Sequence, residues 1–204
     1  TPCGTLFPYT TLFRSLALDD EAYRRRIGGG LNARYAARPD LLVEAELRYL
    51  AEDYRDTDDE PSGSLRSGQD LTFRPGVTYE IGPRTVLSGD LLAGHKNAET
   101  GLESFTDLGV GASLTHVFGA GVVDGWSLTG NVFYRRSAYS DPDPTVDPDV
   151  SRRDDRLDLG LSLGVPLSER LSLSLGVRHS ENDSNLPNYD FDNTTLSVLT
   201  SFAF

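Results

Sequence analysis

The chain has 204 residues, 38% hydrophobic and 25% charged, a composition that excludes a polytopic helical membrane protein and a plainly disordered chain. Its 31 acidic residues outnumber 19 lysines and arginines, and the net charge of −12 argues against broad binding to nucleic-acid phosphates. Because no apolar run approaches the roughly 18 to 20 residues of a spanning helix, any membrane passage has to use strands.

The first 15 residues, TPCGTLFPYTTLFRS, lack the alternation of apolar and polar residues that governs the rest of the chain. They also lack the basic start and continuous apolar core of an export signal. We therefore expect residues 1–15 to be a non-native or disordered leader and residues 16–204 to be a single domain. Residues 16–24, LALDDEAYR, are short and charged, so no strand is predicted there.

From about residue 25 onward, apolar and polar residues alternate, as on the two faces of a β-strand. The clearest stretch is RLDLGLSLGVPLSERLSLSLGVRHS, in which leucine and valine occupy one parity and Asp, Gly and Ser the other. The same rule predicts nine strands, at about residues 25–37, 41–51, 68–80, 85–96, 104–118, 126–138, 154–165, 171–180 and 193–204. Ten or more residues per strand suits a tilted bilayer crossing, which takes about 9 to 11, better than a soluble domain.

Short turns and longer polar loops alternate along the chain, as in outer-membrane barrels with periplasmic turns and extracellular loops. Aromatic residues of the predicted outward parity lie near strand ends, where such barrels carry their interface girdles. The predicted interface residues are Tyr35, Tyr79, Phe118, Trp126, Phe202 and Phe204 at the short-turn end, and Tyr49 and Tyr134 at the loop end.

The last strand places Leu196, Val198, Phe202 and Phe204 at alternate positions and ends on an aromatic residue. It resembles the carboxy-terminal signature of bacterial outer-membrane β-barrels. More narrowly, SENDSNLPNYDFDNTTLSVLTSFAF is similar to the end of β-barrel porins and of the barrel half of surface lipoprotein assembly modifiers, although SFAF departs from the usual penultimate residue. The resemblance implies an outer-membrane location in a Gram-negative bacterium, lipid and lipopolysaccharide as neighbours, and recognition of the last strand by the barrel-assembly machinery.

If the apolar faces contact lipid, the opposite parity lines the lumen. The candidate lumen residues are Glu44, Glu46, Arg48, Asp70, Arg74, Asp90, Asp107, Asn131, Arg135, Asp158 and Arg178. Symmetric register places Glu46 opposite Arg74, and five-residue turns place Arg74 opposite Asp90 and Asp158 opposite Arg178. These charges either tune the passage of solutes or form cross-strand ion pairs that hold the wall.

Catalytic and metal-binding patterns are weak. The three histidines, His95, His116 and His179, fall on the outward parity, where a base has no substrate. The one cysteine, Cys3, cannot form an internal disulfide, and the acidic loop SDPDPTVDPD does not match the spacing of a calcium loop. We therefore expect no enzyme activity, no cofactor and no resident metal.

The sequence predicts an all-β, antiparallel up-and-down transmembrane β-barrel, of which about nine strands are present and whose complete form has ten or more. The expected function is a porin-like channel or transport conduit. One alternative is a translocator that assists the surface display of lipoproteins. Another is a soluble β-sandwich module, in which the leucine-rich faces of two sheets pack on each other.

Overall fold

A computed structural model describes the backbone of residues 4–18, 21–58 and 61–203, and the side chains from Tyr23 onward within those ranges. One sheet contains ten strands in sequence order, each antiparallel to the next. The strands are β1 (Gly4–Leu18), β2 (Glu21–Arg38), β3 (Leu41–Tyr54), β4 (Gly68–Glu80), β5 (Thr85–Ala98), β6 (Phe105–Val117), β7 (Ser127–Pro142), β8 (Ser151–Pro166), β9 (Leu171–Ser184) and β10 (Phe191–Phe202). The predicted up-and-down topology is confirmed, and β2–β10 are the nine predicted strands.

Strand β1 lies where the sequence predicts no strand. Its backbone pairs with β2 from Gly4 opposite Tyr35 to Leu18 opposite Glu21, so residues 16–24 contain the end of one strand and the start of the next. The pairing shifts between Tyr9 and Leu12 and again between Leu16 and Ala17. The first shift adds a residue to β1 and the second adds one to β2. A bulge within β1 interrupts the period of two, so alternation is a poor test for this strand.

Most strands extend further into the loops than their apolar stretches indicate. β7 continues to Pro142 and β8 begins at Ser151, although both segments are polar and were predicted as loop. Backbone hydrogen bonds do not require apolar side chains, so the ladder continues beyond the alternating region. Three short 3-10 helices lie in the connections: η1 (Gly63–Arg66), η2 (Gly121–Val123) and η3 (Pro187–Tyr189). None of the helical segments in the described residues is long and apolar enough to span a membrane.

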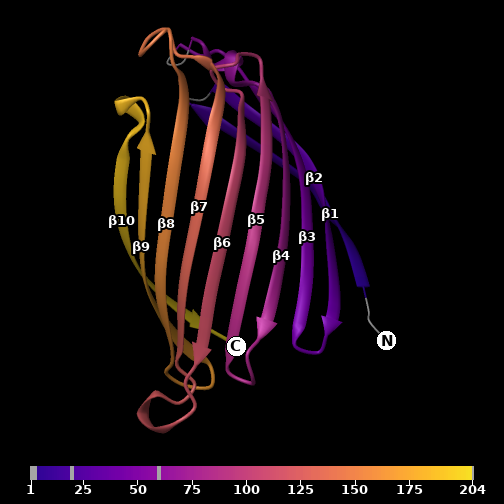
Figure 1. Ribbon diagram of the computed structural model, residues 1–204, viewed down its shortest axis with the longest axis vertical. Coiled ribbons are helices and arrows are strands. Elements are labelled where there is room, and N and C mark those ends of the chain that lie inside the picture. The colour runs from indigo at the N-terminus through magenta and orange to yellow at the C-terminus, as the bar shows by residue number, and fades with distance from the viewer. Residues whose placement is uncertain (1–3, 19–20, 59–60, 204) are drawn as a thin grey trace.

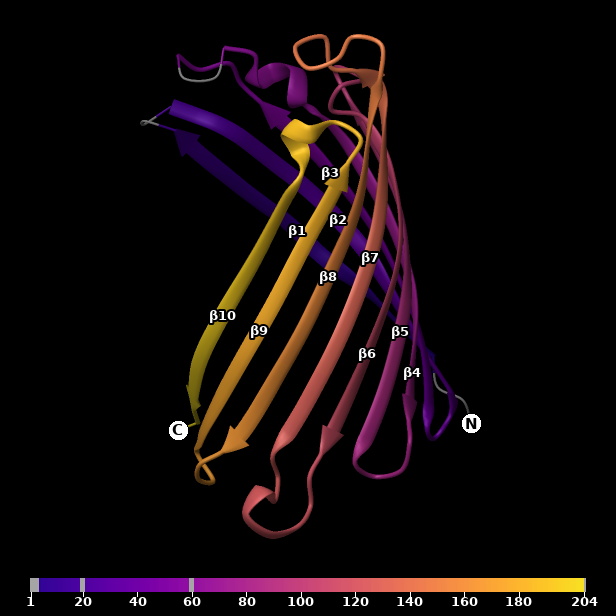
Figure 2. The ribbon, with the colours of Figure 1, turned by 60° about the vertical axis from the view of Figure 1, so that its left-hand side comes forward.

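The sheet curls into a trough rather than a closed barrel (Figures 1 and 2). Within the part of the chain that the structure describes, β1 and β10 are the two ends of the strand order and do not pair with each other. All twelve residues of β10 are exposed, which is consistent with a strand that has a neighbour on one side only. The backbone groups along these two edges are therefore available for pairing with further strands.

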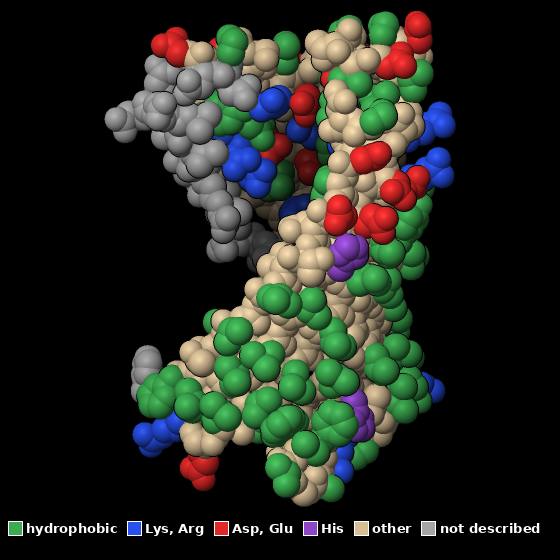
Figure 3. All heavy atoms as spheres, turned by 90° about the vertical axis from the view of Figure 1, so that its left-hand side faces the viewer, with side chains coloured by type: hydrophobic (Ala, Val, Ile, Leu, Met, Phe, Trp, Pro, Cys, Tyr) green, Lys and Arg blue, Asp and Glu red, His purple; other side chains and the backbone are tan. Residues whose placement is uncertain are grey.

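Apolar side chains cover the convex face of the trough. Exposed large hydrophobic residues recur at alternate positions, including Leu108, Val110 and Leu114 on β6 and Leu159 and Leu161 on β8. On β8 the apolar parity runs over nine residues, from Leu157 to Val165, and the next residue of that parity toward the loops is Asp155. Figure 3 shows green side chains gathered over the lower outer surface, with red and blue ones above them. The face therefore divides into an apolar band and a charged rim.

This arrangement contradicts the sandwich alternative. A sandwich requires a second sheet that covers the leucine-rich face, but the described residues form one sheet and leave those leucines about half exposed, Leu161 at 50% and Leu108 at 61%.

The predicted interface aromatics occupy the convex face or the turns beside it. Tyr35, Tyr49, Tyr79, Tyr134 and Phe202 are exposed there, and Phe118 and Trp126 flank the β6–β7 connection, where the Phe118 amide donates to the Trp126 carbonyl over 2.8 Å. Tyr134 lies mid-strand because β7 is longer than predicted. It marks the upper limit of the apolar band, since its hydroxyl donates to Asp155 on the charged rim. Phe204 lies outside the described residues.

Candidate functional site on the concave face

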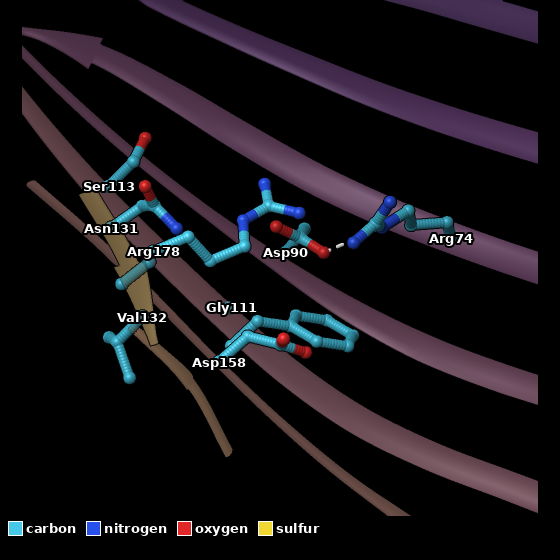
Figure 4. Close-up of a pocket in the computed structure, with 10 residues that line it drawn as sticks. Arg74, Asp90, Gly111, Ser113, Asn131, Val132, Asp158 and Arg178 are labelled. Carbon is cyan, nitrogen blue, oxygen red and sulfur yellow. Dashed lines mark hydrogen bonds and ion pairs between the residues drawn. The ribbon is translucent and has the colours of Figure 1, made fainter. Parts of the chain in front are cut away.

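Side chains from six neighbouring strands meet in one hollow of the trough. The hollow has a volume of about 300 Å³ and is lined by residues from β4 to β9, among them Arg74, Asp90, Asn131, Asp158 and Arg178 (Figure 4). Residues so far apart in strand order can share a hollow only on the concave side of a curled sheet. The structure therefore places these five predicted lumen residues on one concave surface at mid-height of the wall.

An ion pair between Arg74 and Asp90 crosses the β4–β5 hairpin, with Arg74 Nε 2.7 Å from Asp90 Oδ2. The predicted contact is present, but the predicted register is wrong: Asp90 lies opposite Gly76, so the two charged residues contact each other diagonally. Glu46 lies directly opposite Arg74 on β3, as predicted. The Arg74 guanidinium turns to Asp90, and no Glu46–Arg74 ion pair forms within the described residues.

The predicted Asp158–Arg178 pair is also offset by two residues, since Asp158 lies opposite Ser180 and Arg178 opposite Gly160. Asp158 is instead held by Arg156 of its own strand, with 3.0 Å between Arg156 Nε and Asp158 Oδ2, and it accepts a hydrogen bond from the Ser180 hydroxyl.

Arg178 interacts with Asp158 electrostatically but makes no direct contact with its carboxylate. It forms no ion pair with any described residue, and Figure 4 shows its side chain extending past Asn131 toward Asp90, which Arg74 already holds. The wall thus offers one exposed guanidinium to the space inside the trough at this height.

Near the loop end, a second group of charges is withdrawn from solvent. Glu52 on β3 accepts a hydrogen bond from Arg26 Nε on β2 over 2.6 Å and lies 3.7 Å from Lys96 Nζ on β5. The exposed fractions of the Glu52 and Lys96 side chains are 7% and 11%. Because β4 lies between β3 and β5, this contact spans three strands and stiffens the wall.

Asp107 organises a third group on β6 and β7. Its carboxylate accepts a hydrogen bond from the Ser137 hydroxyl over 2.6 Å, and Oδ2 lies 3.7 Å from Arg135 Nη1. Of the remaining predicted lumen residues, Glu44 pairs with Arg34 at 2.6 Å, and Asp70 accepts from the Thr72 hydroxyl. Arg48 is exposed and lies opposite Thr72.

Several residues of these groups were not predicted from the sequence. Arg26, Glu52, Lys96 and Arg156 share the concave parity of their strands, but they lie at strand ends or beyond the clear alternating stretches. Extending the parity rule into the polar strand ends would have found all four. Phe133 was missed for another reason, since an aromatic residue at mid-strand on the polar face runs against the pattern.

At the loop end of the trough, the β9–β10 loop is held against the β7–β8 connection. Tyr189 in η3 donates from its hydroxyl to Asp143 Oδ2 in the β7–β8 loop over 2.9 Å, and the Arg152 guanidinium carbon lies 3.6 Å from the Tyr189 ring centroid. The same guanidinium lies 4.5 Å from the Tyr139 ring centroid, and Leu186 beside η3 is only 3% exposed. The β9–β10 loop is thus fastened to the β7–β8 connection.

This fastening has an expected pH dependence. Hydrogen bonds from Thr145, and further ones from Tyr189 and the Val146 amide, hold the pKa of Asp143 below its ordinary value. A lowered pKa means that the stabilisation is complete above the unfolded value of about 4 and is lost as the pH falls through the folded pKa. Hydrogen exchange of the amides of Leu186 and residues 188–190 should therefore match that of Asp143→Asn below this window and be slower than in the variant at pH 5–8. Equal exchange in the two proteins at all pH values would contradict the assignment.

The three histidines lie on the convex face, each paired with a threonine directly across the ladder. Nδ1 lies 3.1 Å from the Thr106 hydroxyl in His95, 2.8 Å from that of Thr85 in His116 and 2.9 Å from that of Thr194 in His179. Each imidazole is thus part of a cross-strand pair. Among the described residues, no group of three or more His, Cys, Asp or Glu side chains is suited to holding a metal ion.

A scan against protein-family models finds no match, and a search of curated proteins finds none. Among solved structures, the chain is similar to OccAB3 of Acinetobacter baumannii, an outer-membrane β-barrel of the porin family, with a TM-score of 0.55 and 13% sequence identity. The match covers 94% of this chain and 54% of that chain, so this chain spans about half the length of OccAB3. At this identity the similarity concerns the fold: the chain is an all-β, up-and-down sheet of the kind that forms a barrel wall.

Proposed function

We propose that the chain forms part of the wall of an outer-membrane β-barrel and that its concave face lines a water-filled, porin-like conduit for solutes. The observation that carries the proposal is the segregation of side chains between the two faces. Leucine and valine are exposed on the convex face, and ion pairs and hydroxyl groups occupy the concave face. A water-soluble protein has the opposite arrangement, with apolar side chains inside and polar ones outside. In a bilayer, the apolar convex face can contact lipid and the polar concave face can contact water.

The length of the apolar band and the position of the residues above it support the proposal. The apolar band of nine residues on β8 corresponds to the roughly 9 to 11 residues that a tilted strand needs to cross the hydrocarbon. Tyr134 and the charged residues above it mark where an upper headgroup layer would begin. We infer that lipid contacts the band and lipopolysaccharide the rim. We also infer that the exposed strand β10 is the element that the barrel-assembly machinery binds, because one edge of it is unpaired.

Conductance in planar lipid bilayers tests the conduit. We expect the folded protein, expressed from its complete coding sequence, to give stepwise increases of current. We also expect Arg178→Glu to shift the reversal potential in a KCl gradient toward cation selectivity, because the substitution replaces the exposed guanidinium of the concave wall by a carboxylate.

Arg136→Glu makes the same change of charge on the exposed convex rim of β7 and serves as the matched control. It should leave the reversal potential unchanged. A protein that inserts into the bilayer without carrying current would contradict the conduit. An equal shift in both variants would contradict the assignment of the concave face to the lumen.

A further inference from the structure

One aromatic ring lies on the polar face of the wall. Phe133 on β7 has the concave parity and lines the same hollow as Arg74 and Asp90. It leans over β6, where two glycines leave room for it: a Cβ built on Gly109 would come within 3.0 Å of Phe133 Cζ, and one on Gly111 within 2.9 Å of Phe133 Cδ2. One side of the ring therefore rests on the sheet.

The Arg74 guanidinium is the other neighbour of the ring, and it comes from β4, three strands away. Its carbon lies 5.2 Å from the Phe133 ring centroid, within the roughly 6 Å over which the face of an aromatic ring attracts a cation. The same guanidinium points to Asp90 on β5 and donates to it, with 2.7 Å between Arg74 Nε and Asp90 Oδ2 (Figure 4). The Arg74 side chain thus crosses β5 and reaches the ring that lies over β6.

Gly111 allows the carboxylate and the ring to approach the same point of β6. A Cβ on Gly111 would lie 2.7 Å from Asp90 Oδ1 as well as 2.9 Å from Phe133 Cδ2. Both distances are shorter than ordinary contacts, so a side chain at this position would displace one group or the other. Arg74, Asp90 and Phe133 therefore form one cluster, which depends on the glycine beneath it.

A second carboxylate competes for Arg74. Glu46 on β3 lies directly opposite Arg74, a relation in which Cβ atoms are about 4.5 to 5.5 Å apart. Asp90 lies opposite Gly76 and is only a diagonal neighbour, a relation that spans about 7 to 8 Å. Distance along the ladder therefore favours Glu46, yet Arg74 pairs with Asp90, and Glu46 forms no ion pair among the described residues. The Phe133 ring lies on the Asp90 side of Arg74, and its attraction for the guanidinium accounts for the choice.

We propose that Phe133 is a positioning residue, which draws the Arg74 guanidinium to Asp90 and away from Glu46 and thereby fixes the place of this charge in the conduit. The proposal rests on the conduit function. Arg74 has 45% of its side chain exposed, so its charge acts on ions in the trough while the ring and the carboxylate hold it against the wall.

The place of Arg74 matters because the hollow carries a net positive charge. Three arginines and two aspartates lie around it and give a net charge of +1: Arg74, Arg156, Arg178, Asp90 and Asp158. Glu46 does not line this hollow, so a guanidinium that turned back to it would leave the hollow neutral. Positive charge in the wall of a pore favours anions over cations. The uncharged Phe133 therefore sets part of the ion selectivity.

Nitrogen-15 NMR of the folded protein in detergent tests the choice of partner without requiring current. Exchange of the Arg74 Nε–H with water reports which carboxylate protects it, and Arg74→Gln identifies its signal. In the wild type, we expect Asp90→Asn to speed this exchange by up to about fivefold, the range of an exposed ion pair, and Glu46→Gln to leave it unchanged. In Phe133→Leu, which keeps an apolar side chain but has no ring, Glu46→Gln should speed the exchange instead. Phe133→Tyr retains the ring and should behave like the wild type.

Gly111→Ala tests the same cluster without altering its charged or aromatic groups. Its Cβ displaces Asp90 or Phe133, so it should give the dependence on Glu46 that Phe133→Leu gives. Gly130→Ala is the matched control, because Gly130 has the convex parity and a Cβ there meets nothing within 4 Å. It should keep the wild-type dependence on Asp90.

Current in planar bilayers tests the consequence for selectivity. Phe133→Leu should shift the reversal potential toward cation selectivity in the wild type and cause no further shift in Arg74→Gln, because the two residues act through one guanidinium. Equal shifts in the two backgrounds, or an Arg74 exchange that depends on Asp90 alone in every variant, would overturn the positioning role. Exchange that changes partner as expected, in a protein that carries no current, would support the positioning of Arg74 and overturn the conduit.

Discussion

Leu159→Arg should lower the free energy of unfolding of the membrane-inserted protein by about 2 to 4 kcal/mol, because an arginine on the lipid-facing side near the bilayer centre costs that much. Leu159 lies at the middle of β8 and is 42% exposed on the convex face. Urea titration of the protein refolded into lipid vesicles measures the change, and the yield of folded protein in the outer-membrane fraction should fall with it.

Ser162→Arg provides the matched control on the same strand. Ser162 has the opposite parity and lines the concave hollow toward β10, so its arginine can remain in water. We expect its unfolding curve to lie within about 1 kcal/mol of the wild type, as is usual for substitutions on a solvated surface. An equal loss of unfolding free energy in the two arginine variants would contradict a lipid-facing convex face and a water-facing concave face.

Glu52→Gln should destabilise the fold by about 3 to 5 kcal/mol, the usual cost of removing one partner from a buried ion pair. The amide keeps the shape of the side chain but leaves two cations, Arg26 and Lys96, without their shared carboxylate. Since Lys96 has 11% of its side chain exposed, water cannot fully replace that carboxylate. The same urea titration measures the loss.

Glu44→Gln is the control, because it breaks an ion pair that water already screens. Arg34 and Glu44 have 55% and 30% of their side chains exposed, so the expected cost is at most about 1 kcal/mol. If both variants lost the same free energy, the buried group around Glu52 would have no special role in holding β2, β3 and β5 together. Restoration of stability by Lys96→Met in the Glu52→Gln background would strengthen the assignment.

The strands and their two faces could be predicted because each side chain reports the solvent on its side of the sheet. Leucines from 157 to 163 and polar residues from 158 to 164 define the faces of β8 without knowledge of its neighbours. β1 escaped prediction because its ladder with β2 shifts by one residue between Tyr9 and Leu12. A pattern of period two cannot follow a strand through such a shift.

Register depends on turns, and here the sequence prediction was close but displaced. The predicted five-residue turns are present, at 81–85 and 167–171, each one residue later than expected. In both turns the amide of the first residue donates to the carbonyl of the fifth, Ile81 to Thr85 and Leu167 to Leu171. When a turn lies one residue later in the chain, each residue of the first strand pairs with a residue two positions further along the second strand. The faces are therefore unchanged, but Asp90 and Asp158 acquire other partners across the ladder.

Ion-pair partners could not be predicted from face alone. A long side chain reaches residues two positions away on the next strand, or two positions along its own strand, as Arg74 and Arg156 do. Once the register is known, these choices follow from distance and from competition between carboxylates.

The central claim is that the leucine-bearing face of β8 contacts lipid while the alternate face contacts water. Single cysteines at positions 157 to 164, in a Cys3→Ser background, test it directly when the folded protein is inserted in vesicles and a fluorescent label on each cysteine is exposed in turn to brominated lipid and to iodide. We expect brominated lipid to quench the labels at 157, 159, 161 and 163, and iodide to quench those at 158, 160, 162 and 164. Quenching by iodide at all eight positions, or the opposite alternation, would contradict the claim.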